Sequence, residues 1–380
     1  MGYRAMNDPK TVAAEVISRC STQLVELSER IHANPELGWQ EHRASGWVAD
    51  ALAGAGFTVE RPYLGFDTAL RASFGTGPHT VGLCAEYDAL PGLGHACGHN
   101  LISAMTVGAA LALAEVADDV GLTVVVYGTP AEEGLGGKCE LLERGAFTEL
   151  DFAMMAHPAP EDDPDPAALA VSHSHISYQG KAAHAAGAPQ EGINAADAFT
   201  IAQTAIGLLR QHLPATVRVH GVVTNAGEAP NAIAQHTEGR WYVRAETLEE
   251  LHRTEERIWK CFEAGALATG CTLEMTPESK PYSEMRTDQG ALALYRANLE
   301  KLGRVIPDGP GSMSRASTDF ANVSQVVDAI HPYIGVGSSP AVNHQKEFAA
   351  ACVGPAAERA LLDGATALAW TAIDRFARSN

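Results

Sequence analysis

Long hydrophobic runs are missing from this sequence, although 46% of its 380 residues are hydrophobic. No stretch approaches the roughly 20 consecutive apolar residues that a membrane-spanning helix needs, so we expect no membrane anchor. The opening residues, MGYRAMNDPKTVAAEV, mix charged and small side chains without an apolar core segment. This pattern predicts that they are not a secretory signal.

Positive charge is also scarce, with 27 Lys and Arg against 46 Asp and Glu and a formal net charge of −19. A surface of this sign repels nucleic acid and anionic membranes, so neither is expected as a partner.

Cysteine is sparse as well. The chain has seven cysteines, which are scattered along the sequence and odd in number. These cysteines favour reduced thiols in a cytoplasmic protein over a disulfide framework.

The beginning of the chain alternates helical and strand-like segments. Apolar residues at helical spacing predict helices over 10–35, 44–57, 101–117 and 136–147, and short apolar runs predict strands over 68–75, 80–88, 121–133 and 151–158. Such alternation is typical of the α/β class. We therefore expect a mixed, largely parallel sheet flanked by helices.

A change of composition after residue 157 indicates a second domain. The run PAPEDDPDPAAL resembles a solvated connector, and the segment after it predicts a strand, a helix, two strands and a helix. From about residue 284 the first pattern resumes with a helix over 289–303, a strand within 328–337 and a long closing helix over 354–377. The expected organisation is a first domain formed by 1–171 and 284–380, interrupted by a small α+β unit over 172–283.

Polar residues follow the predicted strands at the points where they end. The first strand leads into Glu86 and Asp88, the second into Glu132 and Glu133, and the third into His157. The carboxyl ends of parallel strands lie at one edge of a sheet, where such folds bind their ligands. We therefore expect these side chains to gather at that edge.

Cys97 and His99 lie in the glycine-rich loop HACGH. A Cys-x-His step can turn a thiolate and an imidazole toward one ion, and this donor pair favours zinc. Taken alone the step is weak evidence, because the loop lacks the helical His-Glu-x-x-His pattern and the paired Cys-x-x-Cys pattern. A purely structural Cys and His remain an alternative.

The adjacent carboxylates of Glu132 and Glu133 suggest two different tasks. On an extended backbone their side chains point in opposite directions, so one can bind a metal while the other faces a water molecule. A solvent-facing acidic pair is the alternative. His157 and His344 are candidate ligands in AHP and NHQKEF, and either histidine could instead be structural.

Several motifs in order resemble the M20 metallopeptidases, and within them the amidohydrolase branch that has a cysteine in its metal motif. The motifs are ERIHANPELGWQEHRAS, AEYDALPGLGHACGHNL, TPAEEG, AHP, GKAAHAAGAPQEGINA, NAIAQ, STDFANVS, IHPYIGV and NHQKEF. CGHN and HPYIGV are most similar to aminobenzoyl-glutamate hydrolases and β-alanyl dipeptidases. The chain departs from many relatives at Asn100, where they carry Asp, so Asn100 is given no catalytic charge.

The resemblance implies a di-metal exopeptidase-like catalytic domain with an inserted lid and dimerisation domain, and a homodimer formed through that insert. It implies two divalent ions, with zinc favoured and manganese or cobalt as alternatives, held by Cys97, His99, Glu133, His157 and His344. Cys97 would bridge the ions. Glu132 would be the general base, and Asp88 would orient a histidine ligand.

The resemblance also implies roles for two residues of the insert. His184 would stabilise the oxyanion, commonly from the partner subunit, and Asn231 would help to bind substrate. Arg244 could pair with a substrate carboxylate or be an ordinary surface arginine. Glu86 and His95 have no assigned chemistry and are expected to serve the fold.

The expected function is hydrolysis of the amide bond of a dipeptide or an N-acyl or N-aroyl amino acid with a free carboxylate. The metal ions would lower the pKa of a shared water and polarise the carbonyl. One alternative is a deaminase or deacylase of an aromatic or biosynthetic substrate at the same site. Another is a non-catalytic metal-binding subunit, against which the intact Glu132 and the full ligand set argue.

Overall fold

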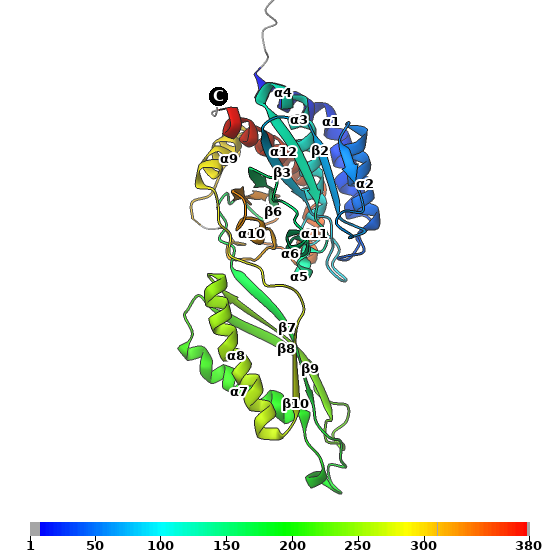
Figure 1. Cartoon of the computed structure of the whole chain (residues 1–380), viewed down its shortest axis with the longest axis vertical. Helices are drawn as coiled ribbons and strands as arrows, with labels where there is room; N and C mark the ends of the chain where they lie inside the picture. The colour runs from blue at the N-terminus through cyan, green and yellow to red at the C-terminus, as the bar shows by residue number, and fades with distance from the viewer. Residues whose placement is uncertain (1–7, 310, 378–380) are drawn as a thin grey trace, which may run out of the picture. The chain divides into compact units, whose positions relative to one another are not determined.

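A computed structural model describes residues 8–309 and 311–377. The chain divides into two compact units, drawn in Figure 1. The main unit comprises Met1–Ala168 and Met285–Asn380, and the inserted unit comprises Leu169–Glu284. No helix within the described residues is long and apolar enough to cross a membrane.

The main unit is built on a six-stranded sheet with the order β1-β2-β4-β3-β5-β11. The strands are β1 (Thr58–Glu60), β2 (Leu70–Phe74), β3 (His79–Ala85), β4 (Leu122–Gly128), β5 (Phe152–Met154) and β11 (Ala329–Ile330). β3 pairs in parallel with β4 and β5, and β5 with β11, whereas β1 and β2 are antiparallel. The predicted mixed, largely parallel α/β sheet is confirmed. Its parallel strands end at one edge.

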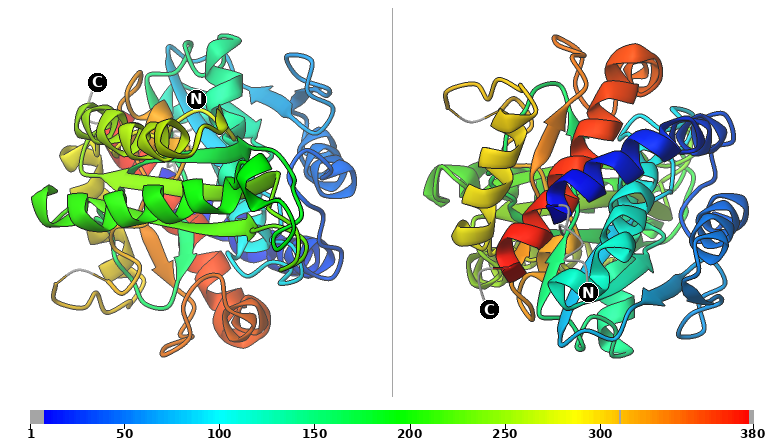
Figure 2. Two further views of the ribbon diagram at one scale, coloured as in Figure 1. Left: turned by 90° about the horizontal axis from the view of Figure 1, so that it is seen from below. Right: turned by 90° about the horizontal axis from the view of Figure 1, so that it is seen from above.

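The helices of the main unit pack on this sheet or on one another. They are α1 (Pro9–His32), α2 (His42–Gly54), α3 (His99–Glu115), α4 (Ala117–Val120), α5 (Glu132–Leu135), α6 (Gly137–Glu143), α9 (Gln289–Lys301), α10 (Phe320–Val323), α11 (Lys346–Ala351) and α12 (Pro355–Ala377). α3 packs against β3, α1 and α12, and the three helices lie side by side in the right-hand view of Figure 2. The close packing of α3 on α1 requires a small residue at Gly108, because an added Cβ there would lie 2.8 Å from a methyl of Leu24.

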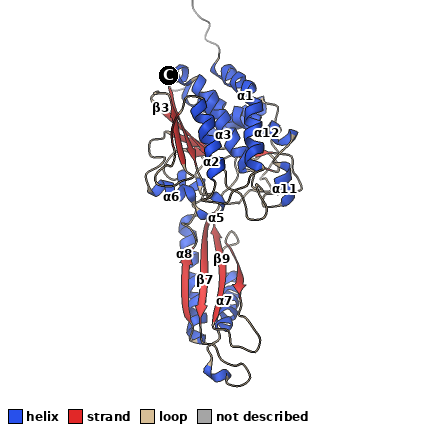
Figure 3. Ribbon diagram, turned by 90° about the vertical axis from the view of Figure 1, so that its right-hand side faces the viewer, coloured by secondary structure: helices blue, strands red, loops and turns tan. Residues whose placement is uncertain are grey.

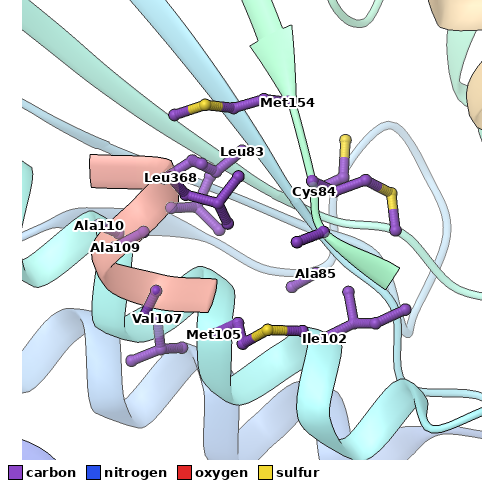
Figure 4. Close-up of a cluster of buried hydrophobic side chains, with 14 of the residues drawn as sticks. Leu83, Cys84, Ala85, Ile102, Met105, Val107, Ala109, Ala110, Met154 and Leu368 are labelled. Carbon is purple, nitrogen blue, oxygen red and sulfur yellow. The ribbon is translucent and has the colours of Figure 1, made fainter. Parts of the chain in front are cut away.

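α3 is buried on almost every side. Only Leu111, Ala114 and Glu115 of its residues are not fully buried. Figure 4 shows Ile102 and Met105 of this helix near β3 in a cluster of buried hydrophobic side chains. Since its alanines and glycine allow neighbouring elements to approach closely, the helix forms the centre of the core and holds its first residue, His99, in a fixed position.

Two predicted strands are each divided in two. The segment 151–158 forms β5 and then β6 (His157–Ala159), and 328–337 forms β11 and then β12 (Tyr333–Gly335). β6 and β12 pair in parallel as a separate two-stranded sheet. His157 therefore begins a short strand and does not end the third strand of the main sheet, contrary to the prediction.

The inserted unit is a four-stranded antiparallel sheet with the order β10-β7-β9-β8. Its strands, coloured red in Figure 3, are β7 (Ala170–Gln179), β8 (Arg218–Asn225), β9 (His236–Ala245) and β10 (Thr272–Pro277). Helices α7 (Ala195–Leu209) and α8 (Leu248–Thr269) pack against it around Phe199, Trp241 and Phe262. β10 was absent from the sequence-based prediction because its residues are mostly exposed and form no apolar run.

Candidate metal centre

The loop between β3 and α3 supplies four buried polar side chains near one another. Glu86 and Asp88 follow β3 directly, and Cys97 and His99 flank Gly98 at the start of α3. Gly98 has a φ of 78°, and a Cβ at this position would lie 2.9 Å from the ring of Pro158. Only glycine fits this left-handed, crowded position, which lets the thiol and the imidazole meet across the helix start.

Three groups of metal-binding donors converge at the carboxyl ends of the strands. The donor atoms within each group lie no more than 4.8 Å apart, and the groups are Cys97 with His99 and His157, Cys97 with Glu133 and His344, and Glu86 with His99 and Glu132. Cys97 and His99 each belong to two groups. The structure therefore brings together all five side chains predicted as metal ligands, and also Glu132.

Hydrogen bonds orient the ring of His99. Its Nδ1 lies 3.0 Å from Oδ1 of Asp88, so the proton on Nδ1 is donated to the carboxylate and Nε2 is turned toward the other donors. Burial favours the neutral acid, but the imidazole of His99 holds the pKa of Asp88 below its usual value. Asp88 therefore contacts the ring of His99, the arrangement that its predicted orienting role requires.

The other two histidines approach the thiol of Cys97. Nδ1 of His157 donates to the carbonyl of Pro158 at 2.8 Å, which leaves Nε2 3.5 Å from the Cys97 sulfur. Nε2 of His344 lies 3.7 Å from the same sulfur and 3.5 Å from Oε2 of Glu133. Burial and the neighbouring His331 lower the pKa of His157. A neutral imidazole is the form that binds a metal.

Glu132 and Glu133 lie on the short turn α5 and not on an extended backbone, so the prediction that they point in opposite directions is wrong. Both reach toward Nε2 of His99, with Oε2 of Glu132 at 4.0 Å and Oε1 of Glu133 at 3.9 Å. The turn is set by Ala131, which has a φ of 60°. The backbone N–H of Glu133 donates to Oδ2 of Asp88 at 3.0 Å. Asp88 thus holds both the ring of His99 and this turn.

Glu41 holds the other end of the turn. Its carboxylate is fully buried and Oε1 accepts the backbone N–H of Ala131 at 2.8 Å. Burial and the nearby Asp88 raise the pKa of Glu41 to about 7. A left-handed conformation at alanine is unfavourable by roughly 1–2 kcal/mol, so this hydrogen bond has a clear positioning role.

Replacing Glu41 by alanine is expected to lower the free energy of unfolding by about 1–3 kcal/mol, because the buried N–H of Ala131 loses its acceptor. Glu41→Gln keeps an acceptor oxygen, so it should lower the free energy of unfolding by clearly less than the alanine variant does. Denaturant unfolding of the metal-stripped protein measures both changes. Equal losses in the two variants would contradict the proposed role of this hydrogen bond.

The electrostatics of the cluster favour a cation. Burial, Glu86 and Glu133 raise the pKa of Glu132, and burial raises the pKa of Glu133. Among the described residues, His99 Nε2, Glu86 Oε2 and Glu133 Oε1 are buried without a hydrogen-bond partner. Unpaired buried acceptors are costly. The donor set of thiol, imidazoles and carboxylates therefore fits divalent ions, and zinc suits it well.

The three predicted site residues of the inserted unit do not form one cluster. His184 and Asn231 lie on neighbouring segments, since Ala185 N–H donates to the carbonyl of Asn231 at 3.0 Å. Both are exposed, and they lie beyond the end of the sheet marked by Gln179 and His236. Arg244 is eight residues along β9 from His236, roughly 27 Å away.

Arg244 pairs with Val171 in the sheet, and Val171 also pairs with Tyr282. Val171 and Tyr282 are close to the first and last residues of the inserted unit, so Arg244 lies where the chain enters and leaves this unit. Its Nε lies 3.4 Å from Nε2 of His220. Partial burial lowers the pKa of Arg244. The side chain is thus half-buried beside a histidine, unlike a fully exposed surface arginine.

Several residues near the centre were not identified from the sequence. Asn343 donates to the Cys97 sulfur at 3.8 Å and to the carbonyl of Pro158 at 3.2 Å. Glu86, expected to serve only the fold, lies among the metal-binding donors and pairs with the buried Lys138. No spacing pattern links Lys138 to the cluster, because tertiary packing alone brings it there.

Two other residues of the loop have different surroundings. Asn100 donates to Ser28 Oγ at 2.8 Å and to the carbonyl of Cys352 at 3.0 Å, which ties α3 to α1 and to the end of α11. The ring of His95 lies 6.1 Å from that of His32, and burial lowers the pKa of His95 to about 3. Neither residue belongs to the three donor groups.

Comparisons with known proteins agree with the geometry. The profile of peptidase family M20/M25/M40 matches residues 82–370. The chain is 41% identical over 381 residues to the Xaa-Arg dipeptidase of Mus musculus, covering 96% of this chain and 88% of that protein. It is 34% identical over 270 residues to one of the subunits of p-aminobenzoyl-glutamate hydrolase from Escherichia coli, covering 66% of this chain and 56% of that protein.

A solved structure of a dinuclear metal binding peptidase from the M20 family of Bacillus subtilis matches with a TM-score of 0.71. The match covers 95% of this chain and 99% of that chain at 20% identity, which supports the fold. The family profile and the close sequence relatives confirm the resemblance seen in the motifs. The chain therefore belongs to the peptidase family M20/M25/M40 and is an amidohydrolase.

Proposed function

We propose that this protein is a dipeptidase or related metal-dependent amidohydrolase. It cleaves the amide bond of a dipeptide, or of an N-acyl or N-aroyl amino acid, with a free carboxylate. The observation that carries the proposal is the convergence of donors around Cys97, whose sulfur lies within 3.7 Å of both His157 Nε2 and His344 Nε2. A thiolate in this position suits a ligand shared between two ions.

The proposed ligands of the two ions are Cys97, His99, Glu133, His157 and His344. When bound, the ions lower the pKa of a shared water and polarise the scissile carbonyl. Zinc is the proposed metal because of the thiolate and the imidazoles, with manganese or cobalt as substitutes. Asp88 keeps Nε2 of His99 aimed at the donor groups by accepting the proton of Nδ1.

Glu132 is the proposed general base. Its carboxylate is buried, lies within 4.0 Å of Nε2 of His99, and has its pKa raised by burial and by Glu86. A raised pKa suits a group that takes a proton from the attacking water and gives it to the leaving amine. Glu133 is directed to His344 as well as to His99, so the two glutamates differ in their surroundings.

His184 is the proposed oxyanion donor. Its Nδ1 accepts the backbone N–H groups of Ala186 and Gly187 at 3.2 and 3.1 Å, so the ring proton lies on Nε2. An exposed N–H donor of this kind can stabilise the charge of a tetrahedral intermediate. Because His184 lies at the end of its sheet remote from the chain connections, we propose that it acts across a homodimer formed through the inserted unit.

Asn231, beside His184, is proposed to contact the substrate across the same homodimer, and the half-buried Arg244 of the other subunit to pair with the substrate carboxylate. All seven cysteines are buried and free of disulfides, which supports the proposed cytoplasmic location. We name dipeptides with a C-terminal arginine as the first substrate class, after the dipeptidase relative, and aminobenzoyl-glutamate as the second.

A substrate panel tests this proposal. The purified protein is incubated with zinc, manganese or cobalt and with Xaa-Arg dipeptides, other dipeptides, aminobenzoyl-glutamate and N-acyl amino acids. Mass spectrometry should show a free amino acid and the matching acid or amine. Release of ammonia alone would indicate a deaminase, and no turnover of any substrate would favour a non-catalytic subunit.

Chelation of the ions is expected to abolish hydrolysis and to destabilise the fold, because the buried carboxylates lose their counter-charge. Zinc present at about 1,000 times its dissociation constant should raise the free energy of unfolding by about 4 kcal/mol. Differential scanning calorimetry of stripped and reloaded protein measures the shift. A melting temperature that is independent of zinc would contradict a buried metal centre.

A further inference from the structure

We propose that Glu86 is a further metal ligand, on the His99 side of the centre, and that Lys138 and Asp319 hold its carboxylate in place. This inference rests on the proposed function, because it requires the metal centre itself. Glu86 is absent from the ligand set implied by the family motifs. In the structure, Glu86 forms a group of possible metal donors with His99 and Glu132, whose donor atoms all lie within 4.8 Å of one another.

The geometry at Nε2 of His99 is the first support. Glu86 Oε2 lies 3.4 Å from His99 Nε2, yet neither atom has a hydrogen-bond partner within residues 8–309 and 311–377. With one ring proton of His99 donated to Asp88 through Nδ1, its Nε2 faces Oε2 of Glu86 at a distance that requires a second ring proton or a metal ion between the two atoms. In the metal-free protein the imidazolium form of His99 supplies that proton, and we place a metal ion there in the loaded protein.

The separation also matches coordination to one ion. Ligand atoms at 2.0–2.2 Å from a tetrahedral ion lie roughly 3.3–3.6 Å apart. The distance of 3.4 Å between Glu86 Oε2 and His99 Nε2 falls in this range. Oε2 of Glu132 lies 4.0 Å from the same nitrogen. This separation exceeds the range for two ligands of one ion, so Glu132 is near the ion without being its ligand.

The buried lysine is the second support. Lys138 has no exposed side-chain surface, and its Nζ lies 2.5 Å from Oε1 of Glu86 and 2.6 Å from Oδ1 of Asp319. The backbone N–H of Lys138 also donates to Oδ2 of Asp319 at 2.8 Å. This arrangement fixes one oxygen of Glu86 and turns the other toward His99.

Charge balance argues against a purely structural role for Glu86. Lys138 supplies one positive charge to the two carboxylates of Glu86 and Asp319, so a second positive charge is needed beside Glu86, on the side where Nε2 of His99 faces its Oε2. A buried carboxylate without full compensation is expensive. A divalent ion on the Oε2 side supplies the missing positive charge.

The test is zinc binding by Glu86→Gln, which keeps the side-chain shape and leaves Lys138 paired with Asp319. Chelator-stripped protein is titrated with zinc by isothermal calorimetry, and its fold is checked by circular dichroism. The parent protein should bind two ions, and in Glu86→Gln the affinity for one of them should fall at least tenfold. The cobalt-loaded variant should also show an altered d–d absorption spectrum.

Asp162→Asn is the matched control. Asp162 is likewise a buried carboxylate that shares a cation, Arg304, with a second carboxylate, Asp363. Its loss should leave both zinc affinities and the cobalt spectrum unchanged. Should Glu86→Gln not fold, Glu86→Asp retains the charge beside Lys138, and its shortened reach should still weaken one ion by several-fold.

The outcomes separate this inference from the proposed function. Parental zinc affinities or a parental cobalt spectrum in a folded Glu86 variant would overturn the assignment of Glu86 and leave the centre intact. A parent protein that binds no zinc would overturn the metal-dependent function and this inference with it. Equal weakening in Asp162→Asn would show that loss of any buried carboxylate disturbs the centre, which also overturns the assignment.

Discussion

Glu132→Gln is expected to lower kcat by about 10²–10⁴-fold while both metal ions remain bound. Glutamine has the same shape as glutamate, but it cannot accept the proton of the attacking water or deliver it to the leaving amine. Since the proposed ligands are other side chains, the zinc content should not change. Steady-state kinetics on the best dipeptide, together with metal analysis of the same sample, measures both quantities.

The control for this variant is Glu115→Gln, because Glu115 is an exposed glutamate at the end of α3. It should keep full activity. A Glu132→Gln enzyme with parental kcat would overturn the assignment of the base. A variant that has lost zinc would instead identify Glu132 as a ligand, in conflict with the proposed division between the two glutamates.

Cys97→Ala is expected to lower the zinc content by at least one ion and to reduce activity by more than about 10³-fold. The sulfur lies within reach of both His157 and His344, so its removal takes a donor from two groups at once. Burial raises the pKa of the Cys97 thiol. The thiolate therefore requires the ions, and binding of zinc should release its proton.

Cys20→Ala is the matched control, since Cys20 is a buried cysteine on α1 whose thiol donates to the carbonyl of Val16. It should bind two ions with parental affinity and release the same number of protons on zinc binding as the parent. Calorimetric titrations in buffers of different ionisation enthalpy measure the proton release. Parental zinc content in Cys97→Ala would exclude Cys97 as a bridging ligand.

The sequence predicted much of the main fold because apolar periodicity and strand ends are local signals. α1 and α12 match their predicted segments closely, and the donors after β3 and β4 gather at one edge as parallel pairing requires. The sequence was less informative about strand boundaries that are set by tertiary pairing. The division of 151–158 into β5 and β6 depends on pairing with β12, whose Tyr333 lies 176 positions after its partner His157.

The candidate site shows the same limit. Cys97 and His99 could be found because their spacing has a chemical meaning, whereas Lys138 lies in none of the named motifs and Asp319, within STDFANVS, was given no role. Their importance arises from complete burial beside Glu86, which no local pattern encodes. The orientation of Glu132 and Glu133 was predicted wrongly because the left-handed conformation of Ala131, held by Glu41, cannot be recognised from an alanine and its neighbours in sequence.

The burial of α3 has a consequence for how this enzyme can change over evolutionary time. His99 is the first residue of a helix that is enclosed by β3, α1 and α12, so mutations that move it must disturb the whole core. Arg244, His184 and Asn231 belong to a unit with its own separate core. Substitutions at Asn231 and Arg244, the proposed substrate contacts, can therefore change the substrate preference without disturbing the core around His99, as long as the proposed oxyanion donor His184 is kept.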